Sequence, residues 1–165
     1  MKILFLGSSS FTGYHFVKNL SKIKNNKIVC LFTKNKNDYQ SIRYNRINAL
    51  SKNKKIKLIY KIKFGDSKFI KLVRKKFDVV CLHHAETKNY NDDKKFKFKK
   101  SINKNIKNIN TLFKNLDKKT LIVISNTIFQ KIKKKKYIAV NNYGKSKSIT
   151  YEKLKEACNK FNIRF

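Results

Sequence analysis

The sequence predicts an α/β fold, in which a doubly wound parallel sheet carries helices on both faces. Two observations lead to this prediction. Short apolar segments alternate along the chain with stretches in which apolar residues recur at helical spacing, and this alternation is typical of β-α-β units. A turn from Gly7 to Gly13 joins the first strand to the first helix. Right-handed crossovers then give an expected strand order of 3-2-1-4-5.

The first half of the chain supplies four of the expected strands. Three of them are almost continuous apolar runs, as expected for strands buried on both faces, and the third in order alternates apolar and polar residues. These strands cover residues 2–6, 27–33, 56–62 and 77–82. The helices between them carry the apolar set Phe16, Val17, Leu20 and Ile23, then the weakly helical residues 38–50, then Phe69, Leu72 and Val73.

The second half predicts two helices and a fifth strand. Residues 94–116 form the clearest helix, because its apolar residues recur at alternating steps of four and three. Residues 120–125 are the fifth strand, residues 131–136 are a lysine-rich loop, and residues 145–161 are the last helix. Residues 162–165 resemble the start of a sixth strand. Since neither a repeat nor a linker is found, we expect one domain over residues 1–165.

Composition excludes several classes of protein. Lys and Arg number 42 against 9 Asp and Glu, which gives a formal charge of +33. Hydrophobic residues make up 41% and aromatic residues 13% of the chain, too many for a disordered polycation. Lys, Asn and Ile have codons built from A and T, so the basic excess is typical of an AT-rich gene. The competing interpretation is a protein that binds nucleic acid or another acidic surface.

The sequence predicts neither a membrane span nor a secretion signal. Its apolar runs are shorter than the ~20 residues of a membrane span, and the first run leads into a glycine turn rather than a cleavage site. The three cysteines, Cys30, Cys81 and Cys158, have no Cys-x-x-Cys spacing, which argues against a disulfide framework and a zinc site. We therefore expect inert buried thiols and a cytoplasmic protein.

The turn from Gly7 to Gly13 lies where dinucleotide-binding folds hold the pyrophosphate. Gly7 allows a tight turn, Gly13 allows the helix to pack closely on the strand, and backbone N–H groups at the helix start face the phosphates. Ser10 stands where the usual fingerprint has its middle glycine. A plain turn that opens a helix is the alternative interpretation.

Tyr143 and Lys147 lie one helical turn apart, so their side chains share a face. An ammonium group near a phenol lowers the phenol's pKa, which is ordinarily about 10. Such a tyrosine can exchange a proton with a sugar hydroxyl near neutral pH. Ser125 closes the fifth strand and can hydrogen-bond the same substrate oxygen. For this pair alone, a solvated helix start is the alternative.

Together these motifs resemble the short-chain dehydrogenase/reductase superfamily, in particular its extended branch of NAD(P)-dependent nucleotide-sugar epimerases and dehydratases. The resemblance extends over essentially the whole chain, in the right order. Residues 1–13 resemble the opening strand and G-x-x-G-F-x-G turn of the branch, residues 77–85 resemble its D-V-V-x-H-x-A-A segment, and residues 124–129 resemble its serine-bearing strand end. Tyr143 and Lys147 match its Y-x-x-x-K motif.

The resemblance implies a Rossmann-like domain with a Ser-Tyr-Lys catalytic site. Tyr143 would be the acid/base, Lys147 would lower its pKa and hold the nicotinamide ribose, and Ser125 would orient the reacting group, with Thr127 as the weaker candidate. The remaining cofactor-binding residues implied by the resemblance are Gly7, Ser10, Phe11, Thr12, Gly13, Thr33, Lys34, Asp66, His84, Ala85 and Asn105. Tyr143 and Lys147 would contact the cofactor as well.

Three departures from the family pattern affect these expectations. Glu86 replaces an alanine and places a carboxylate near the expected cofactor path. The second strand ends in Thr33 and Lys34 without the acid that holds an NAD ribose, and a lysine there favours NADP over NAD. The family continues beyond a sixth strand into a C-terminal substrate region, which we expect to be lacking after Phe165.

The sequence therefore predicts an NAD(P)-dependent epimerase/dehydratase-like oxidoreductase domain that acts on a nucleotide sugar. One alternative is a non-catalytic NAD(P)-binding remnant, or a fragment completed by a homo-oligomer or a partner chain. A basic nucleic-acid-binding protein is the other, and it would bind only nonspecifically through its charge.

Three further sets of residues could be interpreted as binding sites for a metal, a nucleic acid or an anion. His83 and His84 are expected to line the cofactor or pack, rather than bind a metal, because no ligands lie at suitable spacing. Tyr90, Phe96 and Phe98 alternate with lysines as in single-strand binders, but no nucleic-acid signature accompanies them. Residues 133–136 are expected to be a solvated loop, with anion binding as the alternative.

Overall fold

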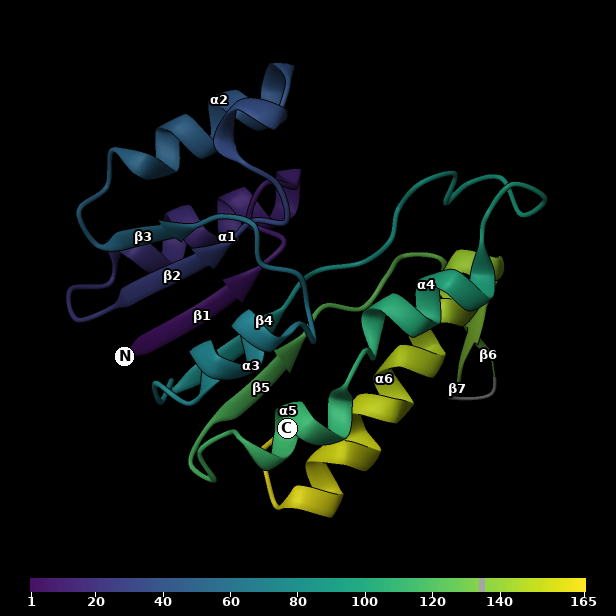
Figure 1. Cartoon of the computed structure of the whole chain (residues 1–165). Helices are drawn as coiled ribbons and strands as arrows, with labels where there is room; N and C mark the ends of the chain where they lie inside the picture. Colours follow the sequence, from purple (N-terminus) through teal and green to yellow (C-terminus); the bar gives the residue numbers. More distant parts are fainter. Residues whose placement is uncertain (134–135) are drawn as a thin grey trace.

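A five-stranded parallel sheet forms the centre of the protein (Figure 1). The structure is a computed structural model and describes residues 1–133 and 136–165. The strands are β1 (Lys2–Leu6), β2 (Lys27–Leu31), β3 (Ile56–Ile59), β4 (Val79–Leu82) and β5 (Leu121–Ile124). Their order is β3-β2-β1-β4-β5, which confirms the predicted order. Because all five run in the same direction, their carboxyl ends meet at one edge of the sheet.

Helices cover the sheet on both faces (Figure 1). The first face carries α1 (Phe11–Lys22) and α2 (Ser41–Ser51) over β1, β2 and β3. The opposite face carries α3 (Ser67–Val73), α5 (Ile109–Lys114) and α6 (Asn142–Phe161), with α4 (Phe98–Asn105) packed on α6. A single 3-10 turn, Lys36–Asp38, precedes α2.

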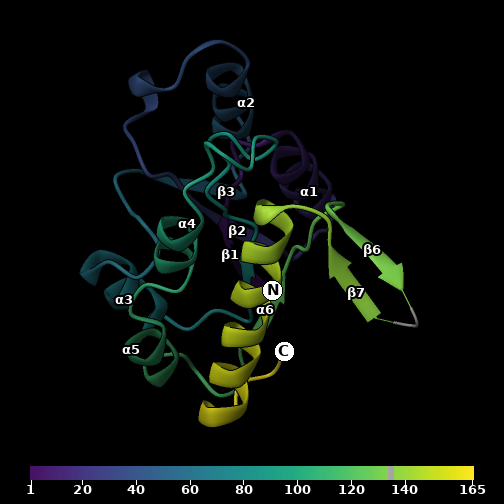
Figure 2. The same ribbon diagram turned by 90° about the vertical axis from the view of Figure 1, so that its right-hand side faces the viewer.

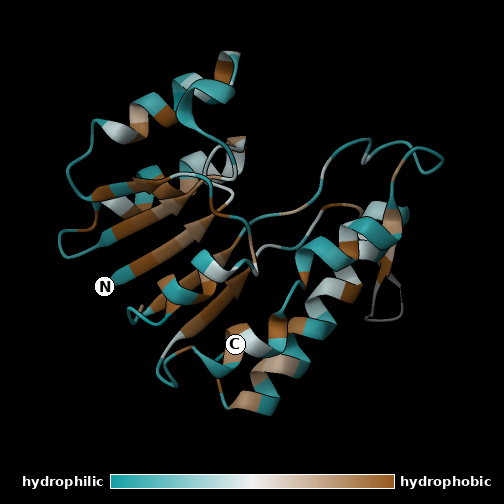
Figure 3. Cartoon of the chain, viewed as in Figure 1, coloured by the Kyte–Doolittle hydropathy of each residue, from teal (hydrophilic) through white to brown (hydrophobic). Residues whose placement is uncertain are grey.

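The apolar strands are explained by burial on both faces, and their hydrophobic residues are visible in Figure 3. Leu4 and Leu6 of β1 belong to the core cluster under α3, α5 and α6, whereas Ile3 and Phe5 belong to the cluster under α1 and α2. Successive side chains of a strand point to opposite faces. A central strand therefore needs apolar residues at every position, as the sequence analysis assumed.

The prediction of one long helix over residues 94–116 is wrong, because the structure has two shorter helices there. Asn108 interrupts them with a left-handed backbone (φ 52°), and its side-chain amide donates to the Gly65 carbonyl at 2.9 Å. Gly65 itself has φ +73°, and a Cβ on it would lie 2.0 Å from the Lys107 carbonyl oxygen. The interruption between α4 and α5 therefore lies where the Gly65 turn packs closely against residues 107–108.

The prediction of a lysine-rich loop over residues 131–136 is also wrong in part. The strands β6 (Gln130–Lys133) and β7 (Lys136–Ala139) pair in antiparallel register as a hairpin, which projects away from the sheet (Figure 2). Lysine and isoleucine alternate before its tip, a period-2 pattern that suits a strand. The anion-binding alternative for residues 133–136 partly concerns positions 134 and 135, which lie outside the described residues.

The last helix starts earlier than predicted. It begins at Asn142 rather than at residue 145, because the Asn141 side chain accepts a hydrogen bond from the Gly144 amide at 2.8 Å and caps the helix. The predicted start of a sixth strand is present as a single parallel bridge between Leu121 and Arg164. This bridge places the end of the chain beside β5.

The three cysteines are free thiols, two of them buried and Cys81 half-buried. Burial raises the pKa of Cys30 and of Cys158 to about 12 and that of Cys81 to about 11. Each is therefore held as the unreactive thiol at neutral pH.

None of the helices in the described residues has the length and apolar character needed to cross a membrane.

Core packing predicts a large contrast between two phenylalanines. Phe113 of α5 is fully buried, whereas Phe11 at the start of α1 is 64% exposed. We expect Phe113→Ala to lower the free energy of unfolding by about 3–5 kcal/mol, because it opens a cavity in the core. The same change at Phe11 is expected to cost less than about 1 kcal/mol. Urea denaturation of both variants measures the difference, and equal losses would contradict the assigned core.

Candidate functional site

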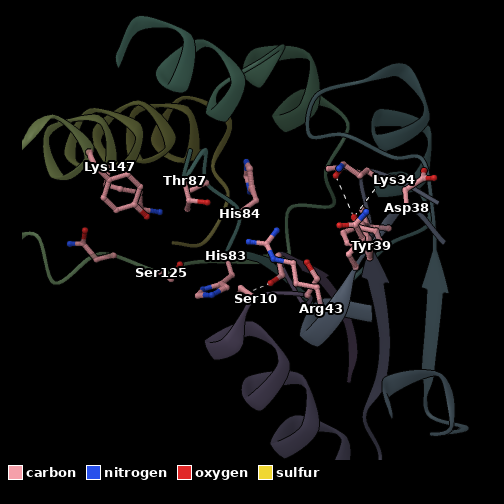
Figure 4. Close-up of a pocket in the computed structure, with 18 residues that line it drawn as sticks. Ser10, Lys34, Asp38, Tyr39, Arg43, His83, His84, Thr87, Ser125 and Lys147 are labelled. Atoms are coloured by element: carbon pink, nitrogen blue, oxygen red, sulfur yellow. Dashed lines mark hydrogen bonds between the residues drawn. The ribbon is translucent and has the colours of Figure 1, made fainter. Parts of the chain in front are cut away.

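A cavity of about 600 Å³ lies at the carboxyl ends of the parallel strands. Its lining comes from the turn after β1, the end of β2 with the following residues, the end of β4, the end of β5 and the start of α6. Figure 4 shows Lys147, Thr87 and Ser125 at one end and Lys34, Asp38 and Tyr39 at the other. Nine of the predicted site residues line it: Gly7, Ser10, Thr33, Lys34, His84, Ala85, Ser125, Tyr143 and Lys147.

The glycine turn is a tightly packed element rather than an open loop. Gly7 has φ +86°, and a Cβ there would lie 2.5 Å from the His83 carbonyl oxygen. A Cβ on Gly13 would lie 2.3 Å from the Gly7 carbonyl oxygen. Both positions therefore require glycine, as the sequence analysis proposed for a tight turn and for close helix packing.

Ser10 closes this turn with its own side chain. Its hydroxyl donates to the Gly7 carbonyl at 2.8 Å and accepts from the Gly13 amide at 3.0 Å, so Ser10 is the N-cap of α1. The next two amides, those of Phe11 and Thr12, have no hydrogen-bond acceptor among the described residues. Such free N–H groups at a helix start are the groups that bind a phosphate.

The end of the cavity near β2 is basic and aromatic. Tyr39 accepts a hydrogen bond from the Lys34 amide at 3.3 Å, and its hydroxyl lies 3.4 Å from Thr33 Oγ1. The Asp38 carboxylate accepts from the Asn35 amide at 3.0 Å. Arg43 also lines this end, in the first turn of α2. Arg43 was not predicted as a site residue; its place in the helix that follows the second strand is the sequence signal that could have indicated it.

Two neutral histidines follow β4 at the floor of the cavity. Burial and the positive charge of Lys147 lower the pKa of His84 to about 3, and the same two causes lower that of His83. The His84 ring stacks on Phe64 at 4.5 Å, and both of its nitrogens are buried without a hydrogen-bond partner in the described part of the chain. No group of three metal-binding side chains is found among the described residues.

Lys147 is the most unusual charge of the site. It is only 4% exposed, and it forms neither a hydrogen bond nor an ion pair within residues 1–133 and 136–165. Burial lowers its pKa to about 8. A buried amine without a counter-charge costs free energy unless it loses its proton or gains a partner. It is therefore available to a ligand in the cavity.

Tyr143 lies in an aromatic enclosure. The rings of Tyr90, Phe96 and Phe129 surround it, with centroids 5.7, 5.9 and 5.8 Å away. Burial raises the pKa of Tyr143, and the charge of an ionised Tyr90 adds to this effect. This direction is opposite to the lowered pKa predicted from the Tyr-Lys spacing, because burial disfavours the charged phenolate.

Two of the three aromatic residues among the lysines, Tyr90 and Phe96, belong to this enclosure. Phe96 is buried beneath Tyr143, Tyr90 packs beside it, and Phe98 lies under the Lys145 ammonium at 5.8 Å. Packing against Tyr143 therefore accounts for Tyr90 and Phe96.

Some predicted cofactor residues are not among those that line the cavity. Phe11, Thr12 and Gly13 form the first turn of α1, directly after the lining residue Ser10, and Asp66 pairs with Lys107 at 2.6 Å. Asn105 is buried and donates to Thr150 Oγ1 at 3.4 Å, where it joins α4 to α6. Thr127 accepts from the Phe129 amide at 3.2 Å instead of lining the cavity, and Glu86 lines a different one.

Comparison with known proteins links this architecture to sugar-nucleotide epimerases. No protein-family model matches the sequence, and a search of the curated proteins finds no match. Among solved structures, UDP-glucuronic acid 4-epimerase from Bacillus cereus, in complex with UDP-glucuronic acid and NAD, is similar with a TM-score of 0.76 at 21% identity. The match covers 99% of this chain and 54% of that chain.

Two further structures show the same likeness. UDP-glucose 4-epimerase from Thermotoga maritima has a TM-score of 0.69 at 15% identity, over 99% of this chain and 53% of that chain. ADP-L-glycero-D-manno-heptose-6-epimerase from Helicobacter pylori has a TM-score of 0.70 at 16% identity, over 99% and 52%. The chain spans about half the length of these proteins, and over that length it has their Rossmann-like fold.

The buried Lys147 predicts a characteristic pH dependence of stability. Its folded pKa of about 8 lies below the ordinary 10.5, so the unfolded chain binds more protons between these pH values. We expect Lys147→Met to be more stable than the original chain by about 2–3 kcal/mol at pH 7. This gap is expected to narrow as the pH rises from 8 to 10.5. Urea denaturation across this range measures it, and a gap that stays constant would contradict the buried charge.

Proposed function

We propose that residues 1–165 are one NAD(P)-binding domain of an epimerase/dehydratase-like oxidoreductase that acts on a nucleotide sugar, in the cytoplasm. The observation that carries the proposal is that one cavity joins the Gly7 turn to Ser125, Tyr143 and Lys147. These residues come from three distant parts of the chain. Their convergence at the carboxyl ends of a parallel sheet is typical of a ligand site.

The cavity fits a nicotinamide dinucleotide in size and in chemistry. Its volume of about 600 Å³ lies in the range of about 300–1,000 Å³ for ligand pockets. The free amides of Phe11 and Thr12 suit a pyrophosphate, and the unpaired ammonium of Lys147 suits a ribose hydroxyl. A bound nicotinamide would supply the acceptor for a hydride from a sugar carbon.

In this proposal Tyr143 moves the proton and Ser125 positions the substrate. The Tyr143 hydroxyl would exchange its proton with a sugar hydroxyl or carbonyl, while Ser125 Oγ, which has no hydrogen-bond partner among the described residues, would bind the same oxygen. The charge of Lys147 would stabilise the phenolate once substrate has displaced water from the aromatic enclosure. Burial has the opposite effect, because it raises the pKa of Tyr143.

The proposed cofactor is NAD or NADP, with a preference for NADP. NAD enzymes of this fold hold the ribose 2′-hydroxyl with an acid at the end of the second strand, and Thr33 and Lys34 stand there instead. Lys34 and Arg43 both line this end of the cavity, and together they provide two positive charges for a 2′-phosphate. Asp38 is the acid that could favour NAD, but its carboxylate is engaged by the Asn35 amide.

A non-catalytic NAD(P)-binding role, or one completed by another chain, is the second candidate. Phe16 and Val123 are 48% and 41% exposed, where the face of β5 on the side of α1 belongs to neither core cluster. This apolar surface favours a covering polypeptide or a second copy. Nucleic-acid binding has only the charge of +33 in its favour.

Removal of the Tyr143 hydroxyl tests the catalytic proposal. We expect Tyr143→Phe to abolish turnover of UDP-sugars with NAD(P), a loss of at least about a hundredfold, because proton transfer is lost. NADPH affinity is expected to stay within about threefold, since the ring keeps its packing. Product analysis and fluorescence titration give the two readouts. Turnover that survives in the variant would contradict the mechanism, and absence of turnover in both proteins with tight NADPH binding would favour the non-catalytic role.

The basic end of the cavity predicts a cofactor preference. We expect Lys34→Gln and Arg43→Gln each to weaken NADPH binding by about tenfold, as expected for the loss of a charge-assisted contact. NADH binding is expected to change little. Titration with both cofactors at two salt concentrations measures this, with Lys36→Gln as the matched control outside the cavity lining. Equal losses for NADH and NADPH would contradict a 2′-phosphate site.

A further inference from the structure

A second, smaller cavity lies on the other side of residues 86–88 from the first. Its volume is about 150 Å³, and its lining comes from the connection after β4 and from α4. Thr87 lines the larger cavity, whereas its neighbours Glu86 and Lys88 line the smaller one. The polypeptide at residues 86–88 thus separates two sites, and nothing in the proposed function uses the second.

The lining of this second cavity is strongly basic. Five of its residues are lysines, and Glu86 is its one carboxylate. The Glu86 carboxylate is bound by the Lys104 ammonium, and this hydrogen bond is the main reason why the pKa of Glu86 is lowered. The other four lysines are Lys88, Lys95, Lys97 and Lys100.

Most of these ammonium groups lack a counter-charge. Lys95 pairs with Asp92 at 3.4 Å. Lys88, Lys97 and Lys100 form no ion pair with a carboxylate in the part of the chain that the structure describes. Like charges gathered around one small volume repel each other, so an anion that enters it gains from all of them at once.

Size and chemistry narrow the class of ligand. A volume of 150 Å³ is below the range of about 300–1,000 Å³ for drug-sized ligands, so the cavity suits a small ion. Lysine ammonium groups bind phosphate as compact point charges, and several of them together suit an ion that carries several charges. We propose that this cavity binds a small oligophosphate the size of diphosphate.

Glu86 has a defined role in this site. Its carboxylate occupies the Lys104 ammonium that a phosphate oxygen would otherwise bind. It therefore competes with the ligand from within the chain, and it also limits the repulsion among the lysines that line the cavity. Loss of the carboxylate should tighten binding, whereas loss of a lysine should weaken it.

The test is calorimetric titration of the full chain with inorganic pyrophosphate at physiological salt. We expect saturable binding of one ion, about threefold tighter in Glu86→Gln, the size expected for release of one exposed ion pair. Lys100→Gln is expected to weaken binding by at least about threefold. Glu156→Gln and Lys155→Gln change the net charge equally but lie on α6, away from the cavity, and are expected to leave the affinity unchanged.

Each outcome decides the proposal. If Glu86→Gln and Glu156→Gln act alike, the binding reflects net charge and the site is overturned. Binding of single-stranded RNA without binding of pyrophosphate overturns it as well. Competition by UDP would identify the diphosphate of a nucleotide as the source, and lack of competition would identify the free ion. NADPH binding is measured separately, so failure here leaves the proposed function untouched.

Discussion

The close contact between the turn after β1 and the end of β4 is the constraint on which the site depends. Gly7 lies so near the His83 carbonyl that no side chain fits between them. This contact holds the start of α1 against the two histidines that follow β4, and so sets the floor of the larger cavity. Because β1 and β4 are neighbours in the sheet, the contact follows from the strand order. The cavity exists only where these two strand ends remain together.

Unbalanced positive charge is the second feature that shapes the molecule. Lys147 is buried beside two histidines, which its charge and their own burial hold in the neutral form. Three lysines of the smaller cavity also lack an acidic partner in the described residues. These three lysines are exposed, so solvent and salt screen part of their charge, whereas the charge of the buried Lys147 is screened much less. Positive charge is therefore a feature that the linings of both cavities share.

The spacing of apolar residues predicted the strands correctly, but it predicted a helix wrongly where tertiary contacts break the backbone. Apolar runs predicted four of the strands, because a strand buried on both faces must be apolar at every position, and alternation predicted β3 at the edge of the sheet. The same reasoning joined α4 and α5, since the apolar spacing continues through Asn108 while the backbone does not. The break accompanies the packing of Gly65 on residues 107–108, two segments that are far apart in the sequence. The hairpin of β6 and β7 was not predicted, because the many lysines there indicated a solvated loop although lysine and isoleucine alternate.

The sequence by itself predicted the strand order and the two glycines of the turn, because apolar strands, a left-handed Gly7 and the close packing of Gly13 are matters of local chemistry. It also predicted nine residues of the larger cavity, several of them only through the family resemblance. The tertiary structure alone decided the electrostatics. Whether Lys147 lowers the pKa of Tyr143 depends on desolvation by Tyr90, Phe96 and Phe129, which residue spacing does not reveal. Arg43 and Glu86 were likewise placed by the packing of their segments, because the cavity that a charged side chain enters depends on neighbours distant in the chain.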